Sequence, residues 1–87
     1  MIKWTGTDTA KRVKWEAEAE TYKELAEKLN ERDLIPSLYD EQGQAWLEHW
    51  HTTSDPEEAW ESMTEDEWKQ FISDSQGMAY YQNIVEI

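Results

Sequence analysis

The chain has 87 residues, enough for one domain with a small core, and it contains no cysteine, which excludes disulfides and thiolate metal sites. Its 20 acidic and 8 basic residues give a net charge of −12, which disfavours direct contact with nucleic acid or an anionic membrane because both are negatively charged. Six Trp, four Tyr and one Phe predict a folded chain, since disordered acidic chains are poor in aromatic residues. We therefore expect a single domain over residues 1–87. The lack of a secretory leader or a long apolar run leads us to expect a soluble cytoplasmic protein.

Residues 1–20 predict a β-hairpin, because apolar side chains recur at every second position, as on one face of a strand. These positions in the second strand are Val13, Trp15, Ala17 and Ala19. A single long helix from about Ala10 to Arg32 is the alternative, because another set of apolar residues has helical spacing. This set comprises Trp15, Ala19, Tyr22, Ala26 and Leu29. We favour the hairpin because a strand predicted at the C-terminus needs neighbours.

A helix is predicted to begin after Thr21 and to run to about Arg32, with Thr21 and Glu24 forming a capping box. Its inner face comprises Tyr22, Leu25, Ala26 and Leu29, and Glu24 and Lys28 are spaced to form an ion pair. We expect Asp33-Leu34-Ile35-Pro36 to end this helix, because the residue before a proline leaves the helical region. A short helix is predicted around residues 45–50, with Gly43 before its start.

Residues 54–75 are strongly acidic, with 8 acidic residues against Lys69 and a net charge of −7. The segments Ser54–Glu57 and Thr64–Glu67 each carry a helix-start pattern, so we predict two helices, at about 55–62 and 65–74. The helix dipole favours carboxylates in a first turn, and this explains part of the charge. The carboxylates that we consider candidates for binding a partner are Asp55, Glu57, Glu58, Glu61, Glu65, Asp66 and Glu67.

Gly77 suits a helix end, and residues 78–87 predict a strand that is rich in β-branched and aromatic residues. The predicted fold is therefore α+β. A small antiparallel sheet, made by the N-terminal hairpin and the C-terminal strand, is covered by three to four short helices, and the Trp side chains pack between the layers.

No catalytic motif is present, so we predict that the chain is not an enzyme and binds no cofactor or metal. His49 and His51, with Glu48 and Asp55 nearby in sequence, are the only histidine feature, and we interpret them as surface residues that flank a core Trp50. A carbohydrate-binding protein or a minor enzyme would instead need a concave pocket lined by His49, His51 or an exposed Trp.

Acidic side chains at regular spacing can imitate a polyanion. Carboxylates on successive helix turns lie ~5–6 Å apart, which is comparable with the spacing of phosphates along a nucleic-acid strand. Such an array would fit the basic groove of a nuclease or another nucleic-acid-binding protein, with a salt-dependent affinity. In the alternative interpretation, the charge serves solubility, and the chain is an interaction module without inhibitory function.

The C-terminal part resembles a family of small phage-encoded anti-CRISPR proteins, the type II-C inhibitors that bind the HNH nuclease domain. The resemblance rests on Gly77-Met78-Ala79, on the flanking segments Lys69–Phe71 and Val85–Ile87, and on Ala45–Trp50. It implies an α/β inhibitor that caps a nuclease active site through the loop and strand after the glycine, and so adds Gly77, Met78, Tyr80 and Tyr81 to the partner-binding residues. The positions after Gly-Met-Ala are small in that family, whereas this chain has Tyr80 and Tyr81 there.

Overall fold

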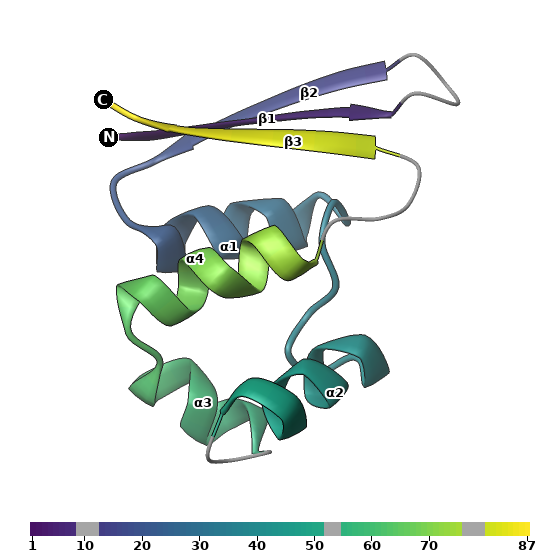
Figure 1. Cartoon of the computed structure of the whole chain (residues 1–87), viewed down its shortest axis with the longest axis vertical. Coiled ribbons are helices and arrows are strands. Elements are labelled where there is room, and N and C mark those ends of the chain that lie inside the picture. Colours follow the sequence, from purple (N-terminus) through teal and green to yellow (C-terminus); the bar gives the residue numbers. More distant parts are fainter. Residues whose placement is uncertain (9–12, 52–54, 76–79) are drawn as a thin grey trace.

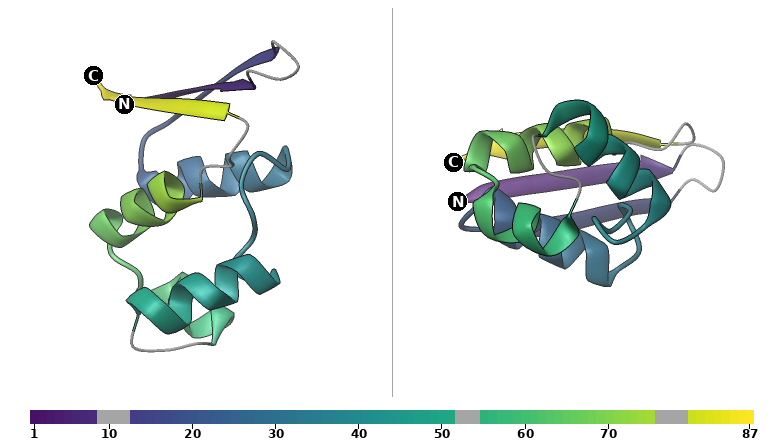
Figure 2. Two further views of the ribbon diagram at one scale, coloured as in Figure 1. Left: turned by 45° about the vertical axis from the view of Figure 1, so that its right-hand side comes forward. Right: turned by 90° about the horizontal axis from the view of Figure 1, so that it is seen from below.

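The fold combines a small sheet with four helices in three layers, which confirms the α+β prediction (Figure 1). The computed structural model describes residues 1–8, 13–51, 55–75 and 80–87, with the side chains of Asp8 and Tyr80 left undescribed. The sheet is one layer, α1 and α4 form the middle layer, and α2 and α3 form the layer farthest from the sheet (Figures 1 and 2). In chain order the elements are β1 (Ile2–Asp8), β2 (Val13–Ala19), α1 (Tyr22–Glu31), α2 (Glu41–Trp50), α3 (Pro56–Ser62), α4 (Glu65–Asp74) and β3 (Tyr80–Glu86).

The N-terminal segment is a hairpin, so the single long helix is wrong for residues 13–19. All pairing is antiparallel in the order β2-β1-β3, and the central strand places Trp4 between Ala17 and Ile84. Trp4 is fully buried. Gly6 lies beneath its ring, and a Cβ at this position would come within 2.3 Å of the Trp4 side chain.

One face of the sheet packs on α1 and α4, while none of the described helices lies over the other face (Figures 1 and 2). Along β2, Ala17 and Ala19 are buried toward the helices, whereas Glu16 and Glu18 are exposed. Lys28 Nζ and Arg32 donate to the outer carbonyls of Glu18 and Glu16, at 2.6 and 2.7 Å. These bonds protect an edge that would otherwise be open to pairing with another strand.

The core is continuous through the three layers, and its largest fully buried side chains include Trp4, Trp68 and Phe71. Trp68 makes edge-to-face contacts with Trp60 and Phe71, at centroid distances of 5.0 and 6.1 Å. Its Nε1 is buried without a hydrogen-bond partner among the described residues. The prediction that Trp side chains pack between layers therefore holds for most of them, but Trp50 is 58% exposed.

The first helix ends just before the predicted segment Asp33–Pro36, and its backbone, rather than the proline, makes the turn. Asp33 has a φ of 57°, and the amides of Asp33 and Leu34 donate to the carbonyls of Asn30 and Leu29. This is the Schellman arrangement, with an aspartate in the position that glycine usually takes. Since α1 is complete at Glu31, the proline lies beyond the turn that ends it.

Gly43 lies inside α2 and is buried, so its predicted position before the helix was wrong. The reason is the close approach of the preceding loop. A Cβ on Gly43 would lie 2.0 Å from the carbonyl oxygen of Ser37 and 2.7 Å from the Cα of Leu38. A glycine that suggests a helix boundary in the sequence is thus a contact point between the helix and the loop.

Candidate functional site: an acidic end opposite the sheet

Negative charge is segregated along the length of the molecule. Residues 33–68 contain 11 acidic residues and no Lys or Arg, so they carry −11 of the net charge of −12. We call this segment the acidic end. It contains α2, α3 and the first turn of α4. The sheet lies at the opposite end of the molecule from α2 and α3 (Figure 1). The Cα atoms extend over 36 Å along the long axis, well beyond the ~10 Å over which salt at 0.1 M screens charges.

Three of the predicted partner-binding carboxylates stabilise helix starts. Asp55 caps α3 by accepting from the amide of Glu57 at 3.0 Å. Glu67 and Thr64 form the predicted capping box of α4. Glu65 accepts from the amides of Tyr22 and Lys23, at 2.7 and 3.3 Å, and thus caps α1 from a neighbouring helix. The Thr21 side chain also caps α1, as predicted, through the amide of Glu24.

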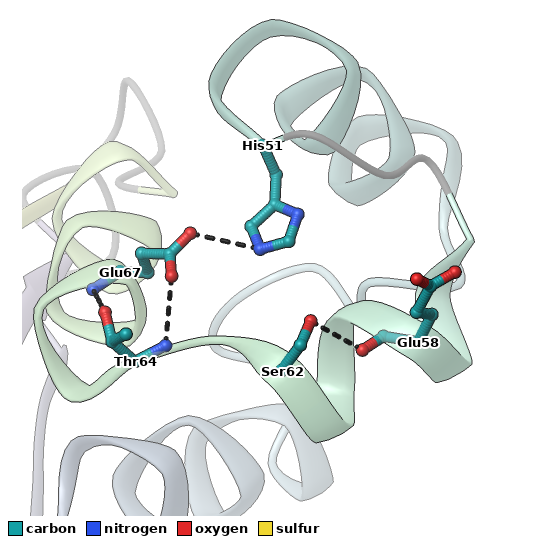
Figure 3. A network of polar contacts seen from close by, with 5 residues as sticks. All are labelled: His51, Glu58, Ser62, Thr64 and Glu67. Carbon is teal, nitrogen blue, oxygen red and sulfur yellow. Dashed lines mark hydrogen bonds and ion pairs between the residues drawn. The ribbon is translucent and has the colours of Figure 1, made fainter.

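His51 connects the end of α2 to the start of α4 (Figure 3). Its Nε2 lies 3.1 Å from a carboxylate oxygen of Glu67, and its side chain is only 9% exposed. The interpretation as surface residues around a core Trp50 therefore holds for His49, which is exposed, and was wrong for His51 and for Trp50. Helix α2 ends at Trp50, and the extended backbone of His51 turns its ring inward, which leaves Trp50 at the surface beside His49.

The other four predicted carboxylates are exposed. They lie on α3 and in the first turn of α4, and are Glu57, Glu58, Glu61 and Asp66. Glu57 and Glu61 are one helix turn apart, which corresponds to ~5–6 Å between their Cβ atoms. The backbone of α3 fixes this spacing, with Pro56 in its first turn. The backbone positions of the carboxylates on α3 are therefore set before any partner arrives.

A polar cluster ties both middle-layer helices to β3. The Tyr22 hydroxyl donates to the carboxylate of Glu86, and Lys69 Nζ lies 3.7 Å from the same carboxylate. Burial, together with the bond to Glu86, raises the pKa of Tyr22 to about 12. The hydrogen bond from Tyr22 and the nearby charge of Lys69 lower the pKa of Glu86.

Tyr22→Phe tests this cluster through the pH dependence of stability. Folding raises the pKa of Tyr22 from its ordinary value of 10.0 to about 12. The contribution of its protonated hydroxyl to the free energy of unfolding is therefore complete below pH 10 and is lost as the pH rises toward 12. Wild type should therefore exceed the variant in unfolding free energy at pH 8, and this difference should shrink between pH 10 and 12. Urea unfolding at each pH measures it. A difference that stays constant over this range would contradict the assigned hydrogen bond.

Of the partner-binding residues implied by the family resemblance, Tyr81 has a described side chain, and it lies on the sheet rather than at the acidic end. Gly77 and Met78 are outside the described residues, and for Tyr80 only the backbone, at the start of β3, is described. Tyr81 is 70% exposed and follows the alternation of β3 onto the face of the sheet that no helix covers. Tyr81 and the exposed carboxylates of the acidic end therefore do not form one continuous surface.

An open pocket of about 330 Å³ lies between α1 and the acidic end, and sequence reasoning missed it. Its lining residues come from α1, the loop before α2, and α3; they are Glu27, Asn30, Glu31, Ser37, Tyr39 and Trp60. Neither His49 nor His51 lines it, whereas Trp60, which is half-buried, does. Within the described residues, no three His, Cys, Asp or Glu side chains are grouped to hold a metal ion.

Comparisons with protein families, with curated proteins and with solved structures found no match to this chain. Among the helices of the described residues, none is long and apolar enough to span a bilayer.

Proposed function

We propose that this chain is a small, non-catalytic inhibitor whose acidic end binds the basic surface of a nucleic-acid-handling host protein. A CRISPR or restriction nuclease in the host cytoplasm is the expected target. The observation that carries the proposal is the absence of any Lys or Arg from residues 33–68, combined with the separation of these residues from the sheet. Helix capping accounts for Asp55, Glu65 and Glu67, whereas Glu57, Glu58 and Glu61 are exposed on α3.

This geometry supports inhibition by mimicry of a polyanion better than inhibition by active-site capping. A partner that binds phosphates through Lys and Arg would meet carboxylates at similar spacing on a preformed helix. Preorganisation lowers the entropy cost of binding. Active-site capping by the segment after Gly77, the alternative that the anti-CRISPR resemblance implies, would use Tyr81 on β3, and β3 lies at the end of the molecule opposite α3 (Figure 1).

DNA cleavage in the presence of the protein tests the proposal. A type II-C CRISPR effector and a restriction nuclease are assayed in parallel, each titrated with the protein. We expect cleavage by at least one of them to stop near an equimolar ratio. If both enzymes cleave normally at a hundredfold excess, the inhibitor proposal fails for these targets, and the interaction module without inhibitory function is favoured.

The same reactions separate the two modes. Mimicry predicts that the inhibited nuclease no longer binds DNA in a gel-shift assay, because the inhibitor occupies the DNA-binding groove. Capping predicts that the nuclease retains DNA but does not cut it.

A further inference from the structure

We propose that the pocket between α1 and α3 binds the guanidinium group of an arginine side chain. This inference rests on the proposed function only in assigning that arginine to the basic partner. The pocket itself is defined by the structure, with a volume of about 330 Å³. This volume lies at the lower end of the ~300–1,000 Å³ that is typical of ligand sites, so it suits one side chain rather than a large ligand.

The chemistry of the walls selects a cation. The lining side chains that carry a formal charge are both negative, Glu27 and Glu31, and they are one turn apart on the same face of α1. An anionic ligand would be repelled, and the described residues offer no third carboxylate or histidine to complete a metal site. An organic cation therefore remains the ligand class that best fits the pocket.

Two aromatic side chains favour a guanidinium over an ammonium group. Tyr39 and Trp60 line the same pocket as the carboxylates, and a planar guanidinium can stack on a ring while donating two hydrogen bonds to a carboxylate. Trp60 already attracts a cation within the molecule, since Lys23 Nζ lies 5.6 Å from the centre of its ring system. An ammonium group can use the charge but not the stacking.

The walls are held in place before a ligand binds. Asn30 Nδ2 donates to the carbonyl of Pro36 at 3.3 Å, which fixes α1 to the loop. The Ser37 amide donates to Asp40 at 2.9 Å, and the Tyr39 amide donates to the Ser37 hydroxyl at 3.1 Å. Because Ser37, Tyr39 and Trp60 belong to the acidic end, a basic surface docked there lies beside the pocket.

Titration of the free protein with butylguanidinium tests the site without any partner. The shifts of the Trp60 indole and of the amides of residues 27–31 are followed by ¹H–¹⁵N NMR at constant ionic strength. Butylammonium has the same charge without the planar group, and butylurea is the neutral analogue. We expect saturable shifts with a millimolar Kd for butylguanidinium, at least threefold weaker binding of butylammonium, and no saturable binding of butylurea.

Paired variants separate the pocket from general charge. Glu27→Gln with Glu31→Gln should weaken butylguanidinium binding at least fivefold, whereas Glu16→Gln with Glu18→Gln, an equal charge change on β2, should alter it less than twofold. Equal weakening by both pairs, or shifts that never saturate in wild type, would overturn the assignment. Neither result would affect nuclease inhibition through α3, so failure of the pocket and failure of the proposed function are distinguishable.

Discussion

Replacing Glu57, Glu58 and Glu61 with lysine is expected to weaken inhibition of the target nuclease about 100-fold. All three carboxylates are exposed on α3, where they form the centre of the proposed contact surface. A reversed charge facing a basic groove loses attraction and adds repulsion, and ~1 kcal/mol for each reversed side chain gives this factor. The measurement is the concentration of protein that halves DNA cleavage.

The matched control reverses Glu16, Glu18 and Glu20, which changes the net charge by the same amount, from −12 to −6. These side chains are exposed in and just after β2, at the end of the molecule opposite α3. We expect the concentration that halves DNA cleavage to change less than threefold, because salt screens charges that far from the contact. A comparable loss of inhibition in both variants would show that inhibition depends on net charge alone and not on the position of the charges.

The reversed α3 variant needs a check on folding, since two positive charges in the first turn of α3 would oppose the helix dipole by ~0.3–1 kcal/mol each. Glu57→Gln, Glu58→Gln and Glu61→Gln together remove the negative charge without this opposition. The neutral variant should lose an intermediate part of the inhibition while keeping the wild-type melting temperature within a few degrees. If it melts normally and inhibits as strongly as wild type, α3 is not the contact surface.

Gly43→Ala is expected to destabilise the protein by about 2–3 kcal/mol. The new Cβ would lie 2.0 Å from the carbonyl oxygen of Ser37, and this neighbour is backbone, which cannot rotate away. Helix propensity alone predicts the opposite sign, a gain of ~1 kcal/mol for alanine inside a helix. Urea unfolding measures the difference, and a fall of roughly 10–20 °C in Tm should accompany it.

Gln42→Ala is the control for this prediction, because Gln42 is exposed on the same turn of α2. We expect its unfolding free energy to stay within ~0.5 kcal/mol of wild type. A stabilised Gly43→Ala protein would show that the loop does not pack against α2 as described.

Local patterns predicted most of the element order, although the spacing of Ala17 and Ala19 left β2 and a long helix as alternatives, and the need of the C-terminal strand for neighbours decided between them. Thr21 and Thr64 marked helix starts that the structure confirms, and the acidic stretch divided into α3 and α4 as predicted. Each of these signals depends on residues close together in the chain, so each could be recognised from the sequence alone.

Features that depend on contacts between distant segments could not be predicted in this way. The sequence does not show that Glu65 caps α1, because the two partners are 43 residues apart. The burial of His51 depends on Glu67, and the position of Gly43 depends on the Ser37 loop. The pocket and the segregation of charge likewise required the packing of α3 beneath α1 and away from the sheet.

The salt dependence of binding tests most directly whether the acidic end holds the partner. The Kd of the inhibited nuclease for the wild-type protein is measured across ~0.05–0.5 M NaCl, beside the variant in which Glu57, Glu58 and Glu61 are replaced by lysine. We expect wild-type affinity to fall steeply across this range and the variant to show a clearly shallower slope. Wild-type affinity that is the same at both ends of this range would contradict binding through the acidic end.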